Sequence, residues 1–141
     1  MTPALAPAHK AFPRRILLVE DEESLRSLLT LFLSRAGYDV MAAGAGEEAV
    51  RIFTGEPDRF AAAIVDLTLP DMSGEALLTR LRAFRPDLPV VVSSGTARTT
   101  AQFAHGAAPV RFLQKPFLPS RLGEALAEML PAQSSSESSA S

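Results

Sequence analysis

The alternation of short apolar runs with segments of helical periodicity is the feature that most limits which folds this chain can adopt. The apolar runs occupy residues 16–19, 40–43, 61–65, 90–92 and 112–113. Runs of this length that are rich in Val and Ile favour strands over helices. Because the runs are continuously apolar rather than alternating, we expect strands that are covered on both faces.

Helical periodicity fills the segments between these runs. After the first run, apolar residues recur at spacings of three and four, and Gly37 stands where such a helix would end. These residues are Leu25, Leu28, Leu29, Phe32 and Leu33. A second helix is indicated by Ala49 and Phe53, and Gly55 and Pro57 would stop it.

Two further helices are expected after the third and fifth runs. Ser73 is placed to cap the first of them, and Glu75 lies in its first turn. Its apolar face would consist of Leu77, Leu81 and Phe84. The apolar face of the last helix would consist of Leu118, Leu122, Leu126 and Met129.

The helical pattern is weakest at residues 97–105, where Phe103 is the only large apolar residue. We expect a short or irregular helix there. Five strands that alternate with five helices predict an α/β fold, a doubly wound five-stranded parallel sheet with helices on both faces. In such sheets, ligands bind outside the carboxyl ends of the strands.

The two ends of the chain differ in composition from its middle. Residues 1–14 are rich in Ala and Pro and indicate a flexible arm, and residues 131–141 are a Ser-rich tail that cannot build a core. One domain is therefore expected over residues 15–130. The net charge is −2, cysteine is absent, and no apolar stretch approaches the ~20 residues of a membrane span. We expect a cytoplasmic protein that binds neither nucleic acid nor a membrane directly.

Polar residues stand at the ends of four predicted strands. Glu20 and Asp21 follow the first strand, Asp66 the third, Ser94 the fourth and Lys115 the fifth. The topology would bring three acids, a hydroxyl and an ammonium to one edge of the sheet. Clustered carboxylates repel one another unless a proton or a cation lies among them. Oxygen-only ligands suit a hard cation, Mg²⁺ above all.

Each of these residues also has an ordinary structural explanation. The run "EDEE" at residues 20–23 is typical of a first helical turn, and Asp66 alone could cap a loop. Lys115 is harder to explain in this way, because Lys10 and Lys115 are the only lysines among fourteen basic residues. A compact ammonium favours a point-charge role. Taken together, the polar residues at the four strand ends favour a functional site over four separate structural roles.

Several catalytic and cofactor motifs are absent from the sequence. Neither G-x-x-x-x-G-K-[ST] nor a G-x-G-x-x-G after a strand occurs, so a nucleotide cradle is unsupported. His9 falls in the arm and His105 in the weak helix. No placed histidine remains for a Ser-His-Asp triad, and nitrogen donors are too few for zinc.

Four successive motifs resemble those of the receiver domain of two-component response regulators: "ILLVEDEESLR", "IVDLTLPDMSG", "PVVVSSG" and "FLQKPF". The resemblance spans residues 15–130 and implies that family's flavodoxin-like topology. It implies that Asp66 accepts a phosphoryl group from a phosphohistidine. Glu20, Asp21 and Asp66 would hold Mg²⁺ together with the backbone carbonyl of Thr68. Glu20 stands where Asp is commoner in the family.

The same resemblance implies a conformational switch. Ser94 corresponds to the family's switch hydroxyl and Phe112 to its aromatic switch residue. Lys115 corresponds to the lysine that contacts the phosphoryl group, often followed by a cis peptide bond, here to Pro116. Ser94 would bond a phosphoryl oxygen on Asp66, and Phe112 would then turn inward.

The expected partners are proteins. The resemblance implies a histidine kinase or a histidine phosphotransfer protein as donor. It places output on the face of the fourth helix, fifth strand and last helix, and it allows a weak homodimer. On the first helix, Leu25, Leu28 and Leu31 form a flank beside the site that could dock on a partner. A broad core-facing stripe is the alternative explanation of this flank.

Two other functions remain open from the sequence. A phosphatase similar to the haloacid dehalogenase superfamily also uses Asp, Ser or Thr, and Lys around Mg²⁺. That family needs a second Asp two residues after its nucleophile, where this chain has Thr68, and its nucleophile ends the first strand. The other alternative is a receiver fold that acts as an interaction module without phosphorylation. A single-domain regulator and the receiver of a hybrid kinase are both compatible with the sequence.

Overall fold

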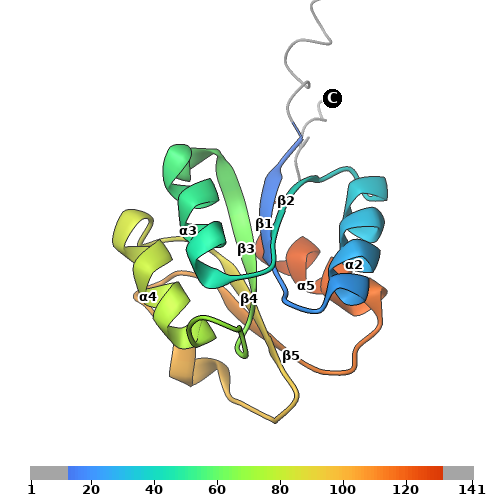
Figure 1. Ribbon diagram of the computed structural model, residues 1–141. Helices are drawn as coiled ribbons and strands as arrows, with labels where there is room; N and C mark the ends of the chain where they lie inside the picture. The colour runs from blue at the N-terminus through green and yellow to red at the C-terminus, as the bar shows by residue number, and fades with distance from the viewer. Residues whose placement is uncertain (1–12, 132–141) are drawn as a thin grey trace, which may run out of the picture.

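The computed structural model describes residues 13–131 of the chain, and a five-stranded sheet forms its centre (Figure 1). The strands are β1 (Arg15–Val19), β2 (Asp39–Ala43), β3 (Phe60–Asp66), β4 (Val90–Ser94) and β5 (Val110–Gln114). Their order is β2-β1-β3-β4-β5, and all four neighbouring pairs are parallel. The predicted parallel sheet is confirmed, and every carboxyl end lies at the same edge.

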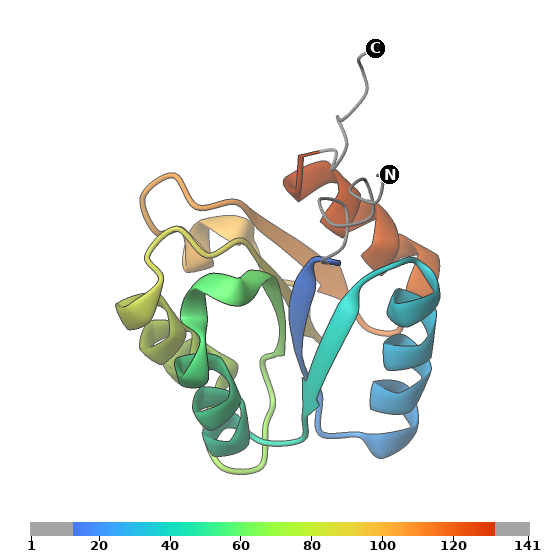
Figure 2. The ribbon, with the colours of Figure 1, turned by 90° about the horizontal axis from the view of Figure 1, so that it is seen from above.

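Helices cover both faces of this sheet. The α-helices among the described residues are α2 (Glu23–Arg35), α3 (Gly46–Gly55), α4 (Gly74–Phe84) and α5 (Pro119–Met129). Helices α3 and α4 lie on one face, and α2 and α5 lie on the other (Figure 2). Helix α2 ends as predicted, because Gly37 follows it with a φ of +102°, a conformation that glycine adopts without strain.

The core consists of two apolar layers that the sheet separates. In β1, Leu17 and Val19 point into the layer beneath α3 and α4, whereas Ile16 and Leu18 point into the layer beneath α2 and α5. All four side chains are at most 1% exposed. A strand that is buried on both faces needs apolar residues at successive positions, which explains the continuous runs.

The fourth of the five predicted helices is not an α-helix, and the expectation of a short or irregular helix at this position is confirmed. Between β4 and β5, the described chain forms a 3-10 turn, η3 (Thr100–Phe103), in place of an α-helix. Thr99 caps it reciprocally with Gln102, then Ala104 is extended and Gly106 adopts a φ of +57°. One large apolar residue, Phe103, cannot anchor a longer amphipathic helix. A second 3-10 turn, η2 (Pro57–Arg59), follows α3.

Two residues expected on buried helix faces are instead exposed. Phe84 is 54% exposed at the end of α4, whereas Arg82, two residues earlier, is 6% exposed. Leu118 is 68% exposed because it precedes α5 as its N-cap residue. The third predicted helix is present, but its buried residues include Arg82 and not Phe84.

The turn between β3 and α4 directs the chain away from the carboxyl edge. Ser73 caps α4 as predicted, with its Oγ accepting a hydrogen bond from the Ala76 N–H at 3.0 Å. A Cβ on Gly74 would lie 2.6 Å from the Leu67 Cα, so the turn is too close to β3 for a side chain there. The Asp71 carboxylate accepts the N–H groups of Gly46 and Glu47 at 2.8 and 2.9 Å, which joins this turn to the start of α3.

The two ends of the described domain lie side by side. The Arg14 carbonyl accepts the Asp39 N–H at 2.8 Å, and the Arg14 guanidinium donates to the Pro131 carbonyl. The predicted arm and tail otherwise lie outside the described residues. No helix within residues 13–131 has the length and apolar character needed to cross a membrane.

Candidate functional site

Three acidic residues meet at the carboxyl edge of the sheet. Asp66 is the last residue of β3, and Glu20 directly follows β1. Both are nearly inaccessible, with 3% and 2% of their surfaces exposed, whereas Asp21 is exposed. The parallel order places β1 beside β3, so the residues that end these strands are neighbours as predicted.

Lys115 connects the two buried carboxylates. Its Nζ lies 2.9 Å from Glu20 Oε1 and 3.1 Å from Asp66 Oδ2. The other oxygen of each acid accepts a backbone N–H: Glu22 donates to Glu20 Oε2 at 3.0 Å, and Thr68 donates to Asp66 Oδ1 at 3.0 Å. Lys115 follows β5, and its peptide bond to Pro116 is cis, as predicted.

Two opposing effects set the pKa values at this site: burial disfavours the charged form of each group, and the ion pairs favour it. Burial raises the pKa of Glu20, and the nearby Asp66 charge adds to the increase, while hydrogen bonds from Glu22 and Lys115 partly offset it. Burial alone would lower the pKa of Lys115, but its bonds to Glu20 and Asp66 outweigh burial and raise it. The two buried carboxylates thus share the single ammonium of Lys115. When both are ionised, the cluster carries more negative than positive charge.

The cluster has the donor geometry of a cation site. One carboxylate oxygen from each of Glu20, Asp21 and Asp66 lies within 4.8 Å of the other two. The donors are all oxygen atoms, two of the acids are buried, and the cluster is negatively charged, so the set fits a hard divalent cation. Thr68 lies two residues beyond Asp66, and the role of its carbonyl as a ligand stays a prediction.

The predicted switch residues lie on the two neighbouring strands. Ser94 ends β4 and is 5% exposed; its Oγ accepts the Thr96 N–H at 3.1 Å and lies 3.2 Å from Thr96 Oγ1. The Ser94 hydroxyl is therefore engaged with its own loop, a partner that the sequence did not indicate. Phe112, in β5, is half-buried and packs against the core layer beneath α3 and α4.

The three candidate docking leucines on α2 differ in exposure. Leu28 and Leu31 are each 50% exposed, whereas Leu25 is partly buried against the core layer beneath α2 and α5. The neighbouring Leu29 is 1% exposed and fills the core. Core packing therefore does not account for Leu28 and Leu31.

Comparison with known proteins identifies the family. The profile of the response regulator receiver domain matches residues 16–127. The chain belongs to this family. It is 34% identical over 108 residues to the transcriptional regulatory protein CssR of Bacillus subtilis. The aligned region covers 76% of this chain and 47% of CssR. It is also 34% identical over 119 residues to the sensor kinase CckA of Brucella abortus. That aligned region covers 84% of this chain and 13% of CckA.

Solved structures agree with this assignment. The receiver domain of the hybrid histidine kinase CckA superposes with a TM-score of 0.72 at 32% identity, covering 83% of this chain and 99% of that one. A CheY-like receiver domain protein from Methanospirillum hungatei superposes with a TM-score of 0.73 at 29% identity, covering 82% and 92% of the two chains. The chain spans less than half the length of CssR and of CckA.

Membership of the receiver family decides between a receiver domain and a phosphatase. The chain is a receiver domain of two-component signal transduction, a class of module that interacts with histidine kinases and downstream proteins. The dehalogenase-like phosphatase is not favoured, and the position where it needs a second acid holds Thr68.

Proposed function

We propose that this receiver domain accepts a phosphoryl group on Asp66 and passes the signal to a protein partner. One observation carries the proposal: Asp66, at the end of β3, is paired with Lys115 at 3.1 Å and clustered with Glu20 and Asp21. A buried nucleophilic carboxylate, a positive charge and a set of oxygen donors are the parts that phosphoryl transfer requires.

In the proposed reaction, a carboxylate oxygen of Asp66 attacks the phosphorus atom of a phosphohistidine in line. A P–O bond forms, the P–N bond breaks, and the leaving imidazole nitrogen takes the electron pair. Glu20, Asp21 and Asp66 would hold Mg²⁺, which when bound offsets negative charge on the transferred group. Lys115 supplies a second positive charge at Asp66 Oδ2. Hydrolysis by water later restores the carboxylate. In this proposal the domain catalyses only its own phosphorylation and dephosphorylation.

The switch is proposed to act through Ser94. Its hydroxyl would leave Thr96, to which it is bonded at 3.1 Å, and bond a phosphoryl oxygen on Asp66. The displacement of this loop would open space beside Phe112, which would turn inward. Output is proposed through the face of η3, β5 and α5, where Leu118 is 68% exposed. A weak homodimer and a cytoplasmic location stay predictions, testable by sedimentation and by fractionation.

Labelling of the full chain with acetyl phosphate tests the reaction. In Mg²⁺, intact mass should increase by one phosphoryl group, and fragmentation should place it in the peptide that contains Asp66. Excess EDTA should suppress labelling, because repulsion between the acids and the incoming phosphoryl group is then not offset. Labelling that is equally fast in EDTA, or that maps outside residues 60–66, would contradict the proposal.

A donor kinase is proposed to dock on the flank formed by Leu25, Leu28 and Leu31. Leu28→Ala should slow phosphotransfer from a cognate histidine kinase and leave labelling by acetyl phosphate unchanged. The fold should tolerate this change, within about 0.5 kcal/mol, because the Leu28 side chain is 50% exposed.

Leu29→Ala is the matched control for this docking prediction. It removes a neighbouring side chain that is 1% exposed, and should lower stability by about 2–5 kcal/mol. Equal loss of kinase and acetyl phosphate labelling in Leu28→Ala would indicate damage to the fold and exclude docking by this residue.

A further inference from the structure

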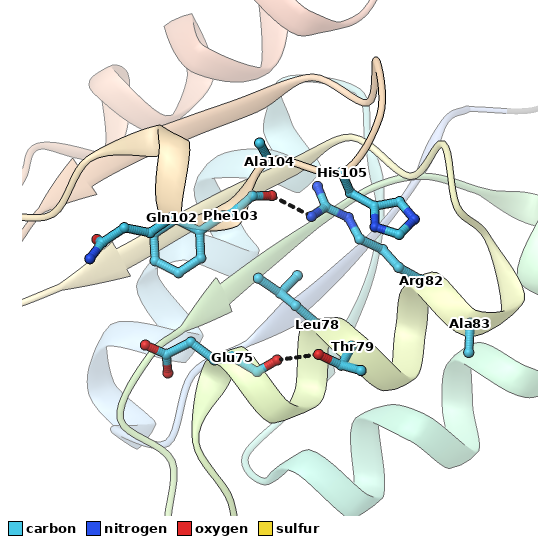
Figure 3. Close-up of a pocket in the computed structure, with 9 residues that line it drawn as sticks. All are labelled: Glu75, Leu78, Thr79, Arg82, Ala83, Gln102, Phe103, Ala104 and His105. Carbon is cyan, nitrogen blue, oxygen red and sulfur yellow. Dashed lines mark hydrogen bonds between the residues drawn. The ribbon is translucent and has the colours of Figure 1, made fainter.

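The side chain of Arg82 is buried without the partners that a guanidinium needs. It projects from α4 and is 6% exposed. Its Nη1 donates to the Phe103 carbonyl at 2.5 Å, while Nε and Nη2 are buried with no hydrogen-bond partner among residues 13–131 (Figure 3). Buried polar groups are nearly always bonded, and an unpaired charge is the most costly exception.

No acid of the described chain neutralises Arg82. Within those residues no carboxylate oxygen lies within ion-pair distance of its guanidinium, and burial lowers its pKa, although an arginine stays charged at neutral pH. Glu75, an acid of the same helix that lines the same cavity as Arg82, is paired with Arg98. A positive charge with two unused donors therefore lies beneath the surface.

Arg82 lines a cavity of about 420 Å³ between α4 and residues 102–105, which comprise the end of η3 and the segment that follows it (Figure 3). Leu78 and Phe103 contribute apolar walls, and Thr79 and Gln102 contribute polar groups. His105 also lines the cavity. Residues of η3, a four-residue 3-10 turn, form part of the wall opposite α4. The volume of the cavity is in the range of small-molecule sites.

We propose that this cavity binds a small organic acid, with its carboxylate on Arg82 and its apolar body against Leu78 and Phe103. The buried Nε and Nη2 have no partner, and they match the two oxygens of a carboxylate once the guanidinium turns toward the cavity. A single buried cation with apolar neighbours suits a monocarboxylate better than a phosphate, which is more highly charged and needs more donors. Arg98 offsets Glu75, the acid of the cavity, so an anion is not repelled there. The site is separate from Asp66 and does not depend on phosphorylation.

The test is a titration of the ¹⁵N-labelled full chain with benzoate and, separately, with hexanoate, followed by amide chemical shifts. Saturable shifts should appear at residues 78–83 and 102–105. Benzamide has the shape of benzoate without its charge, and it should bind about tenfold more weakly or not at all, because it cannot replace the charged pairing with Arg82. Equal binding of benzamide, or no saturation by either acid up to its solubility limit, would overturn the proposal.

Two variants assign the site to Arg82. Arg82→Met removes the guanidinium and keeps an apolar side chain, and should weaken benzoate binding by about tenfold or more. Arg80→Met is the matched control on the same helix; Arg80 is exposed and paired with Glu47 at 2.6 Å, and its loss should leave the affinity unchanged. Unweakened benzoate binding by Arg82→Met would overturn the assignment. If that variant does not fold, the comparison of benzoate with benzamide on the wild type decides.

Discussion

Replacing Asp66 with Asn should abolish phosphorylation and, in EDTA, raise the melting temperature. Labelling is lost because an amide oxygen is a poor nucleophile and Asp66 is the only acid at the end of β3. Stability rises because the change removes one of two buried carboxylates that share Lys115, while Asn can still accept the Thr68 N–H at 3.0 Å. We expect a gain of about 1.4 kcal/mol for each unit by which removal of the Asp66 charge lowers the pKa of Glu20. Intact mass and thermal melts provide the two measurements.

Mg²⁺ and a second acid serve as controls for this variant. Mg²⁺ at a hundred times its dissociation constant should stabilise the wild type by about 2.7 kcal/mol, and the variant by less. Asp71→Asn should still be labelled, but should melt lower, because one of the two N–H groups at the start of α3 loses its acceptor. An Asp66→Asn protein that is labelled, or that melts below the wild type in EDTA, contradicts the assignment.

Lys115→Met should destabilise the domain more than any other single change at the site. It leaves Glu20 and Asp66, whose side chains are 3% and 4% exposed, without a cation. Removal of one partner from a buried ion pair costs about 3–5 kcal/mol, and because Lys115 is itself 25% exposed we expect about 3 kcal/mol, or about 10 °C. The measurement is a thermal melt of the variant and wild type in EDTA at pH 7.5.

The loss of stability caused by Lys115→Met should become smaller as the pH falls. The folded-state pKa of Glu20 is already raised above its ordinary value of 4.5, and removal of Lys115 raises it further. A carboxyl group with a raised folded pKa costs stability above that pKa, and the cost disappears as the group takes up a proton on acidification toward 4.5. Mg²⁺ should also restore more stability to the variant than to the wild type.

Arg80→Met is the control, since it breaks an exposed pair with Glu47 and should cost at most about 1 kcal/mol. Similar melting temperatures for Lys115→Met and the wild type would show that Lys115 does not neutralise the buried acids.

The strands could be predicted from the sequence because burial on both faces leaves a local signature. The third apolar run, residues 61–65, differs from the observed strand β3 only by the addition of Phe60 and Asp66 at its two ends. The contacts among Glu20, Asp66 and Lys115 followed from topology alone, because parallel strands bring their carboxyl ends together. These inferences needed no knowledge of side-chain packing.

The features that the sequence did not reveal depend on contacts between distant residues. Arg82 resembles any solvent-facing arginine of a helix, and its hydrogen bond to the Phe103 carbonyl joins it to a residue twenty-one positions away. Asp71 caps α3 from a position twenty-five residues after Gly46, which no local capping pattern could indicate. The Ser94–Thr96 contact depends on how the loop after β4 bends. Spacing rules cannot capture such contacts.

The strand order has a consequence for the moment at which the molecule becomes able to signal. Lys115 follows the last strand, β5, which pairs with β4 at the edge of the sheet. A nascent chain on the ribosome can therefore carry Asp66 and both other acids well before it carries their cation. At translation rates of about 5–20 residues per second, the forty-nine residues between Asp66 and Lys115 correspond to a delay of several seconds. During that delay the nascent chain has uncompensated acids in place of a finished site, so competence to receive the phosphoryl group is acquired only after Lys115 has been synthesised.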